Sequence, residues 1–97
     1  MSTEENPSPQ QLRDWWIYAC REHRKALILT EFARAATGMV DQAIANGNTS
    51  GLPNYGDPSL VSEALHEALD MLGDTERVLA QLRTEAYAAF NTAVQQN

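Results

Sequence analysis

The most constraining feature of this sequence is a pair of long segments in which small or apolar residues recur at alternating steps of four and three. In residues 9–46 the repeat comprises Leu12, Trp16, Ala19, His23, Ala26, Thr30, Ala33, Thr37, Val40 and Ile44. In residues 58–94 it comprises Val61, Leu65, Ala68, Leu72, Thr75, Leu79, Leu82, Ala86, Ala89 and Ala93. This spacing is typical of the contact line between two helices that wrap around each other. The sequence therefore predicts an all-α fold of two long helices.

Both segments begin with recognisable helix start signals. Ser8-Pro9-Gln10-Gln11 can form a capping box with proline at the first helical position, and Asp57-Pro58 repeats the capping residue and the proline. Asn46-Gly47 is the pair expected where a chain leaves a helix through a left-handed residue. The connection over residues 47–57 is rich in turn formers. Because a connection this short returns the chain on itself, we expect an antiparallel helical hairpin.

Two glycines leave an alternative open. Gly38 and Gly73 lie inside the helical segments, and a glycine costs a helix about 1 kcal/mol relative to alanine. Breaks at one or both would give three or four shorter helices instead of two. We favour continuity, because the repeat keeps its phase through Gly73. We expect one helical domain over residues 9–97, preceded by a disordered acidic tail at residues 1–8.

The loop also predicts which residues lie level with each other. In this register the leucine-rich start of the second helix faces small residues of the first, and Trp16 faces the alanine-rich end of the second helix, with Tyr87 and Phe90 beside it. Large residues against small ones are what close packing requires. The register also places His23 opposite Gln81 and Leu82 as a structural histidine.

The hairpin leaves apolar residues of the first helix without a partner. Ile28, Phe32, Ala35 and Met39 follow helical spacing and point away from the second helix. Since a soluble monomer rarely exposes such a stripe, we expect a homodimer or higher homo-oligomer, most simply a four-helix bundle. The alternatives are a broken helix that buries the stripe on itself, or a different protein partner. The expected interface residues are Ile17, Ile28, Phe32, Ala35, Met39, Trp15 and Tyr18.

Charge and composition narrow the function classes. The net charge is −6, which argues against nucleic acid as a partner, although Arg21, Arg24 and Lys25 form a small basic band. No run approaches the roughly 18 apolar residues that cross a membrane, and there is no signal segment. Cys20 is the single cysteine, so no disulfide framework exists. We expect a cytoplasmic protein that needs no membrane.

One short motif suggests metal chemistry. Glu63-Ala-Leu-His66 places a carboxylate and an imidazole three residues apart on one helix, as in di-iron carboxylate bundles. In this motif and in the hairpin shape the chain resembles ferritin-like proteins, including the small two-helix encapsulated kind. The resemblance implies a dimeric metal site with Glu63, His66 and Glu31 as candidate ligands. Because Glu63 and His66 fall on the outward side of the repeat, we keep metal binding as an alternative and assign no cofactor.

The length, acidity and antiparallel helices also resemble the small helical hairpins of type VII secretion. Their Trp-x-Gly turn is absent, since the loop carries Asn54-Tyr55-Gly56, so only architecture is carried over. No nucleophile–base pairing or phosphate-binding glycine loop is present, and we do not expect an enzyme. The predicted function is protein–protein interaction or a small structural or regulatory role. One form of this function would be a phage or bacterial protein that binds a host protein.

Overall fold

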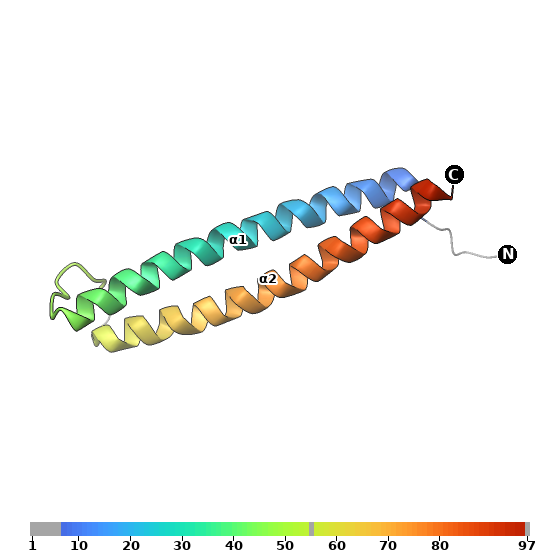
Figure 1. Cartoon of the computed structure of the whole chain (residues 1–97). Helices are drawn as coiled ribbons and strands as arrows, with labels where there is room; N and C mark the ends of the chain where they lie inside the picture. The colour runs from blue at the N-terminus through green and yellow to red at the C-terminus, as the bar shows by residue number, and fades with distance from the viewer. Residues whose placement is uncertain (1–6, 55, 97) are drawn as a thin grey trace.

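The protein is a hairpin of two long antiparallel helices. A computed structural model describes residues 7–54 and 56–96. Helix α1 spans Pro9–Ala45 and α2 spans Pro58–Gln95, and the two lie side by side along their whole length (Figure 1). The molecule measures 67 × 25 × 15 Å, so it is a single layer of helices. The predicted hairpin is confirmed.

Both helices are continuous through their glycines. Gly38 lies within α1 and Gly73 within α2, so the alternative of three or four shorter helices is wrong. A helix of this length can absorb one glycine, because the cost is about 1 kcal/mol and packing along the whole helix offsets it. Among the described residues, neither helix has a stretch long and apolar enough to cross a membrane.

The helix starts follow from their capping residues. The backbone N–H of Gln11 donates to Ser8 Oγ at 3.2 Å, and the Ser8 N–H donates to Gln11 Oε1 at 2.9 Å. This is the predicted capping box, with Pro9 at the first helical position. At α2, the Ser59 N–H donates to Asp57 Oδ1 at 2.9 Å. Ser8 is therefore part of the helix start, and residues 1–6 of the expected tail lie outside the described residues.

The end of α1 is a Schellman turn. Gly47 has φ of +71°, the left-handed region that glycine adopts without steric cost. The Asn48 N–H donates to the Ala43 carbonyl at 2.9 Å, and the Gly47 N–H donates to the Ile44 carbonyl at 3.1 Å. These two bonds satisfy carbonyls that the helix end would leave open, and they turn the chain into the loop.

The interface between the helices is built on the predicted repeat of α1. All six buried residues of α1 belong to it: Ala19, His23, Ala26, Thr30, Thr37 and Val40. The Thr30 hydroxyl donates to the Ala26 carbonyl at 2.8 Å, and the Thr37 hydroxyl donates to the Ala33 carbonyl at 2.7 Å. Because each hydroxyl bonds to the preceding turn of its own helix, both threonines are buried without leaving that hydroxyl unpaired.

The repeat of α2 is only partly correct. Thr75 and Leu82 are exposed, whereas Glu76 is half-buried. The physical reason is His23 of α1, because a buried imidazole is costly unless it is hydrogen-bonded and Glu76 supplies that bond. Helix α2 therefore turns its contact line toward Glu76 near its middle.

The register agrees with the expectation at both ends. Near the loop, the Ser62 hydroxyl donates to Asp41 Oδ1 at 2.5 Å. Near the termini, the Trp16 ring lies 5.0 Å from the Tyr87 ring and 5.7 Å from the Phe90 ring, centroid to centroid. Large rings therefore close the alanine-rich end of α2, as the sequence predicts.

Candidate functional site

The hairpin has two long faces, one on each side of the line where α1 meets α2. On one of them, polar side chains connect the helices. We call this the polar face, and its residues are His23, Asp41, Ser62, His66, Glu76 and Arg83. Among the described residues, the side-chain hydrogen bonds that join α1 to α2 all lie on this face.

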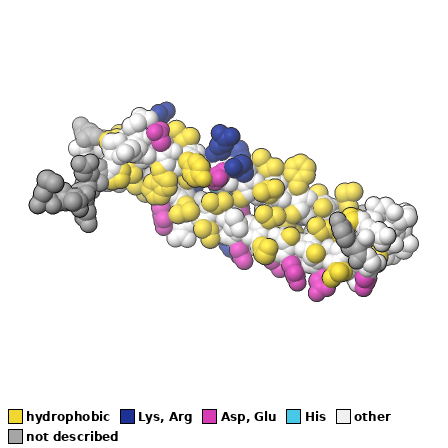
Figure 2. Space-filling view, turned by 180° about the vertical axis from the view of Figure 1, so that it is seen from behind, with side chains coloured by type: hydrophobic (Ala, Val, Ile, Leu, Met, Phe, Trp, Pro, Cys, Tyr) yellow, Lys and Arg dark blue, Asp and Glu magenta, His cyan; other side chains and the backbone are white. Residues whose placement is uncertain are grey.

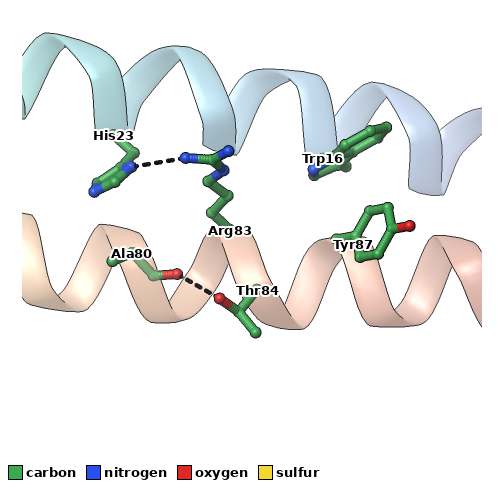
Figure 3. A pocket seen from close by; sticks show the side chains of 6 residues that line it. All are labelled: Trp16, His23, Ala80, Arg83, Thr84 and Tyr87. Atoms are coloured by element: carbon green, nitrogen blue, oxygen red, sulfur yellow. Dashed lines mark hydrogen bonds between the residues drawn. The ribbon is translucent and has the colours of Figure 1, made fainter.

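A buried histidine forms the centre of the polar face. His23 Nε2 lies 2.8 Å from Glu76 Oε1, and His23 Nδ1 lies 3.4 Å from a guanidinium nitrogen of Arg83. A carboxylate only accepts and a guanidinium only donates, so the proton is assigned to Nε2. In Figure 3, Arg83 rises from α2 and lies between His23 and Trp16 of α1. Each nitrogen of the imidazole thus has a partner of the right kind.

The polar side chains around the hollow beside His23 already form hydrogen bonds within the protein. It has a volume of about 420 Å³ and is lined by Trp16, His23, Ala80, Arg83, Thr84 and Tyr87 (Figure 3). The Thr84 hydroxyl donates to the Ala80 carbonyl at 3.0 Å, while His23 and Arg83 bind each other. The bond between His23 and Arg83 therefore helps to fix how α2 packs on α1, while the Thr84 hydroxyl is paired within α2.

A second polar cluster lies nearer the loop. Asp41 accepts from the Ser62 hydroxyl through one oxygen, and its other oxygen lies 2.8 Å from His66 Nε2. The hydrogen bond from Ser62, with a smaller effect of His66, holds the pKa of Asp41 below its usual value. A single aspartate of α1 thus binds two residues of α2.

The candidate metal ligands do not come together. His66 binds Asp41, and Glu31 forms an ion pair with Arg34 at 2.6 Å within α1. Glu63 is exposed. Within residues 7–54 and 56–96, no group of three or more histidine, cysteine, aspartate or glutamate side chains is placed to hold a metal ion.

The opposite face carries an apolar groove. The groove has a volume of about 790 Å³ and lies at the loop end of the hairpin. Every side chain that lines it is apolar: Ala36, Val40, Pro53, Leu60, Val61, Ala64, Leu65 and Ala68. Space-filling Figure 2 shows one long face of the hairpin, with hydrophobic side chains along its length, acidic side chains along one edge and basic side chains near the other.

Large exposed residues extend the two sides of this groove along the helices, and we call them its rims. On α1, Leu29, Phe32, Ala36 and Met39 follow steps of three and four, so they share one side of the helix with the groove. On α2, Met71 and Val78 continue the position of Ala64 at steps of seven. Phe32 and Met39 are both 72% exposed and Met71 is 66% exposed. We call these residues and those lining the groove the apolar face.

Polar groups mark the other half of the same face. A smaller hollow of about 290 Å³ is lined by Leu29, Leu72 and Leu79 together with Glu22 and Lys25. Lys25 Nζ lies 2.5 Å from Glu22, and this hydrogen bond lowers the pKa of the Glu22 carboxyl. Toward the termini, the Gln81 amide donates to Glu85 at 3.2 Å. The half near the loop is therefore the wholly apolar part of the face, whereas the other half mixes apolar side chains with polar ones.

The expected interface residues divide into two groups. By their spacing, Phe32 and Met39 lie on the apolar face, and Trp15 and Tyr18 continue their side of α1 toward the terminus. Ile17 and Ile28 instead line a separate hollow with Cys20, Arg21 and Arg24 on the outside of α1. Ala35 lies seven residues after Ile28 and is exposed on that same outer side.

Several basic side chains bind a polar partner, either within their own helix or on the other helix. Arg77 binds Asp74, Arg83 binds His23, and Lys25 binds Glu22. Arg21 and Arg24 lie beside Ile17 and Ile28 on the outer side of α1. The small basic band seen in the sequence therefore lies beside two exposed isoleucines.

Comparison of the chain with protein-family models, with curated proteins and with solved structures finds no match.

Proposed function

We propose that this protein is a self-associating helical hairpin that acts as a non-enzymatic protein-interaction or small structural module. The apolar face is the surface through which it associates. We further propose a cytoplasmic location, since a chain with a single cysteine has no need of an oxidising compartment.

The observation that carries this proposal is the open apolar groove with its exposed rims. Eight apolar residues line it, and Phe32, Met39 and Met71 stand beside it with about two thirds or more of each side chain exposed. Burying apolar surface stabilises by about 25 cal/mol per Å². Contiguous apolar surface of this kind marks an interaction site.

The shape of the hairpin supports the same conclusion. Its accessible surface is 7397 Å², well above the roughly 5,500 Å² expected of a compact chain of this size. Of α2, which is described throughout, only Ala86 is buried, and Leu65, Leu72 and Leu79 remain half-buried. Domains are built from at least two packed layers, and a second layer would complete this core.

Sedimentation velocity at micromolar to tens of micromolar concentration tests the proposal. We expect a mass above that of the monomer for the native chain. Phe32→Glu should shift the particle toward the monomer, because it places a charge on the rim of the groove. Circular dichroism of the variant checks that the helices persist. A monomer mass for the native chain at these concentrations would refute self-association.

The metal-bundle alternative gains no support from the geometry, because His66 binds Asp41 and Glu31 binds Arg34. Metal analysis of the purified protein, with Glu63→Ala and His66→Ala as controls, tests it separately. Stoichiometric metal that is lost in both variants would favour that alternative over the interaction module.

A further inference from the structure

We propose that a second copy of this chain covers the apolar face, related to the first by a two-fold axis parallel to the helices. Both loops then lie at the same end of a four-helix bundle. Each α1 packs antiparallel against its own α2 and against the α2 of the partner. This inference rests on the proposed self-association and specifies its geometry.

The first argument is the position of the apolar surface along the hairpin. The wholly apolar groove lies in the loop half, whereas the ion pair Glu22–Lys25 and the hydrogen bond Gln81–Glu85 lie in the terminal half. An antiparallel overlap of full length would press polar groups of one copy onto the groove of the other. Placing both loops at one end sets apolar half on apolar half.

The second argument is the fit between the two rims. Asp41 pairs with Ser62, and Phe32 and Met71 each lie nine residues farther from the loop than these two, so Phe32 is level with Met71. A two-fold axis along the groove carries the α1 rim of one copy over the α2 rim of the other. Phe32 then meets Met71 of the second copy, and Met39 meets its Ala64. Each contact occurs twice, as a closed two-fold interface requires.

The third argument is charge. Residues 9–46 carry a formal charge of +1 and residues 47–97 carry −5. The first range contains α1 and the second contains α2. Packing α1 on the partner's α2 sets a nearly neutral helix against an acidic one, whereas packing α2 on α2 would bring two acidic helices together.

The surface area leaves room for an interface of ordinary size. The chain exposes nearly 2,000 Å² more than the roughly 5,500 Å² of a compact chain. Stable interfaces bury about 600–1,000 Å² of each partner. One additional hairpin on the apolar face would therefore cover about a third to a half of this excess.

Distance measurement between spin labels tests the arrangement. In a Cys20→Ser background, one variant carries Ser50→Cys in the loop and another carries Gln10→Cys at the start of α1; both sites are exposed. Pulsed electron–electron resonance on each labelled protein reports the distance between the two copies. We expect a distance of roughly 20–35 Å for both label pairs, the width of a four-helix bundle plus the label arms.

The possible outcomes separate this inference from the proposed function. A dimer mass with a Gln10 pair beyond about 60 Å would overturn the parallel arrangement alone. An antiparallel dimer, whether the copies overlap fully or only over their loop halves, places the termini at opposite ends, and one hairpin is already 67 Å long. A monomer mass for the Cys20→Ser parent and for the native chain would refute the proposed function as well. Short distances for both pairs would support the inference.

Discussion

The two faces of the hairpin use the same two helices in opposite ways. On the polar face, the side chains of α1 and α2 bind each other: Glu76 binds His23, and Ser62 and His66 bind Asp41. On the apolar face, the hydrogen bonds and ion pairs stay within one helix, as in Glu22–Lys25 and Gln81–Glu85. Hydrogen bonds are directional and are saturated by one partner, whereas apolar surface is not. The polar face therefore fixes the hairpin, and the apolar face remains able to bind.

The largest effect is expected from a charge in the groove. Ala36 lines the groove, whereas its neighbour Ala35 lies on the outer side of α1. Ala36→Glu should raise the dissociation constant of the dimer at least about 100-fold, because it buries an unpaired charge. Ala35→Glu makes the same chemical change on the same helix and should alter the constant less than about 3-fold. Equal effects in sedimentation equilibrium would contradict the division into faces.

A smaller effect, on folding rather than association, is expected on the polar face. His23 is 8% exposed and holds both Glu76 and Arg83. His23→Ala should lower the free energy of unfolding by about 2 kcal/mol, since it removes a buried side chain together with its hydrogen bonds to the other helix. Urea unfolding at fixed protein concentration measures this loss. Glu76→Gln retains an acceptor for the imidazole and should cost less.

The mass of the His23→Ala protein provides the control for that prediction. Because His23 lies on the polar face, the variant should have the same particle mass as the native chain under all conditions in which it is folded. A change in mass without a change in stability would show that the polar face takes part in association.

Substitution of the helical glycines should stabilise the fold, in contrast to His23→Ala. A Cβ at Gly38 or at Gly73 would meet nothing within 4 Å. Gly38→Ala and Gly73→Ala should each raise the free energy of unfolding by about 0.5–1 kcal/mol, because alanine loses less conformational freedom in a helix. Neither residue belongs to the polar or the apolar face, so the mass should not change. Destabilisation by either variant in thermal unfolding would show that the helix needs flexibility there.

The smallest effect is a pH dependence at Asp41. The Ser62 hydrogen bond and His66 lower the pKa of Asp41 in the folded state. A lowered pKa contributes stability above the ordinary value of about 3.9, and that stability is lost as the pH falls through the folded value. Asp41→Asn should therefore be less stable than the native chain at pH 7, and the gap should close below about pH 4. A gap in melting temperature that stays constant from pH 7 to pH 2 would disprove this linkage.

Much of the fold follows from local signals in the sequence. Ser8, Pro9 and Asp57 specify the helix starts, and Asn46-Gly47 specifies the end of α1. The short loop then determines the register, because it leaves little freedom in where α2 begins. Trp16 meets Tyr87 and Phe90 as a consequence.

The contact line of α2 was less predictable. The repeat was identified from apolar and small residues alone. The burial of His23 depends instead on a hydrogen bond to a residue 53 positions away in the sequence. Several carboxylates of α2 compete for that role, and nothing local distinguishes Glu76 from the others. A buried histidine in a helix contact line does indicate that a partner exists on the facing helix.

The position of the apolar face depends on the hand of the hairpin. The outward stripe of α1 includes residues on both of its sides, and Phe32 and Ile28 lie next to each other on a helix considered alone. The side on which α2 lies puts Phe32 on the same side of α1 as the groove residue Ala36, and it puts Ile28 on the outer side. The pattern Leu29, Phe32, Ala36 and Met39 is visible in the sequence, and it becomes meaningful once α2 is placed.

The short loop also sets the order in which the hairpin forms. Closing a loop of about ten residues takes roughly 10–100 ns, so Asp41 and Ser62 meet early. Trp16 and Tyr87, which are in contact, are separated by most of the chain. The entropy cost of bringing them together falls only after the intervening turns of α1 have packed against those of α2. Substitutions near the loop should therefore change the folding rate, whereas those at Trp16 should change the unfolding rate. The hairpin should open first at its termini, and the fluorescence of Trp16 should report that opening.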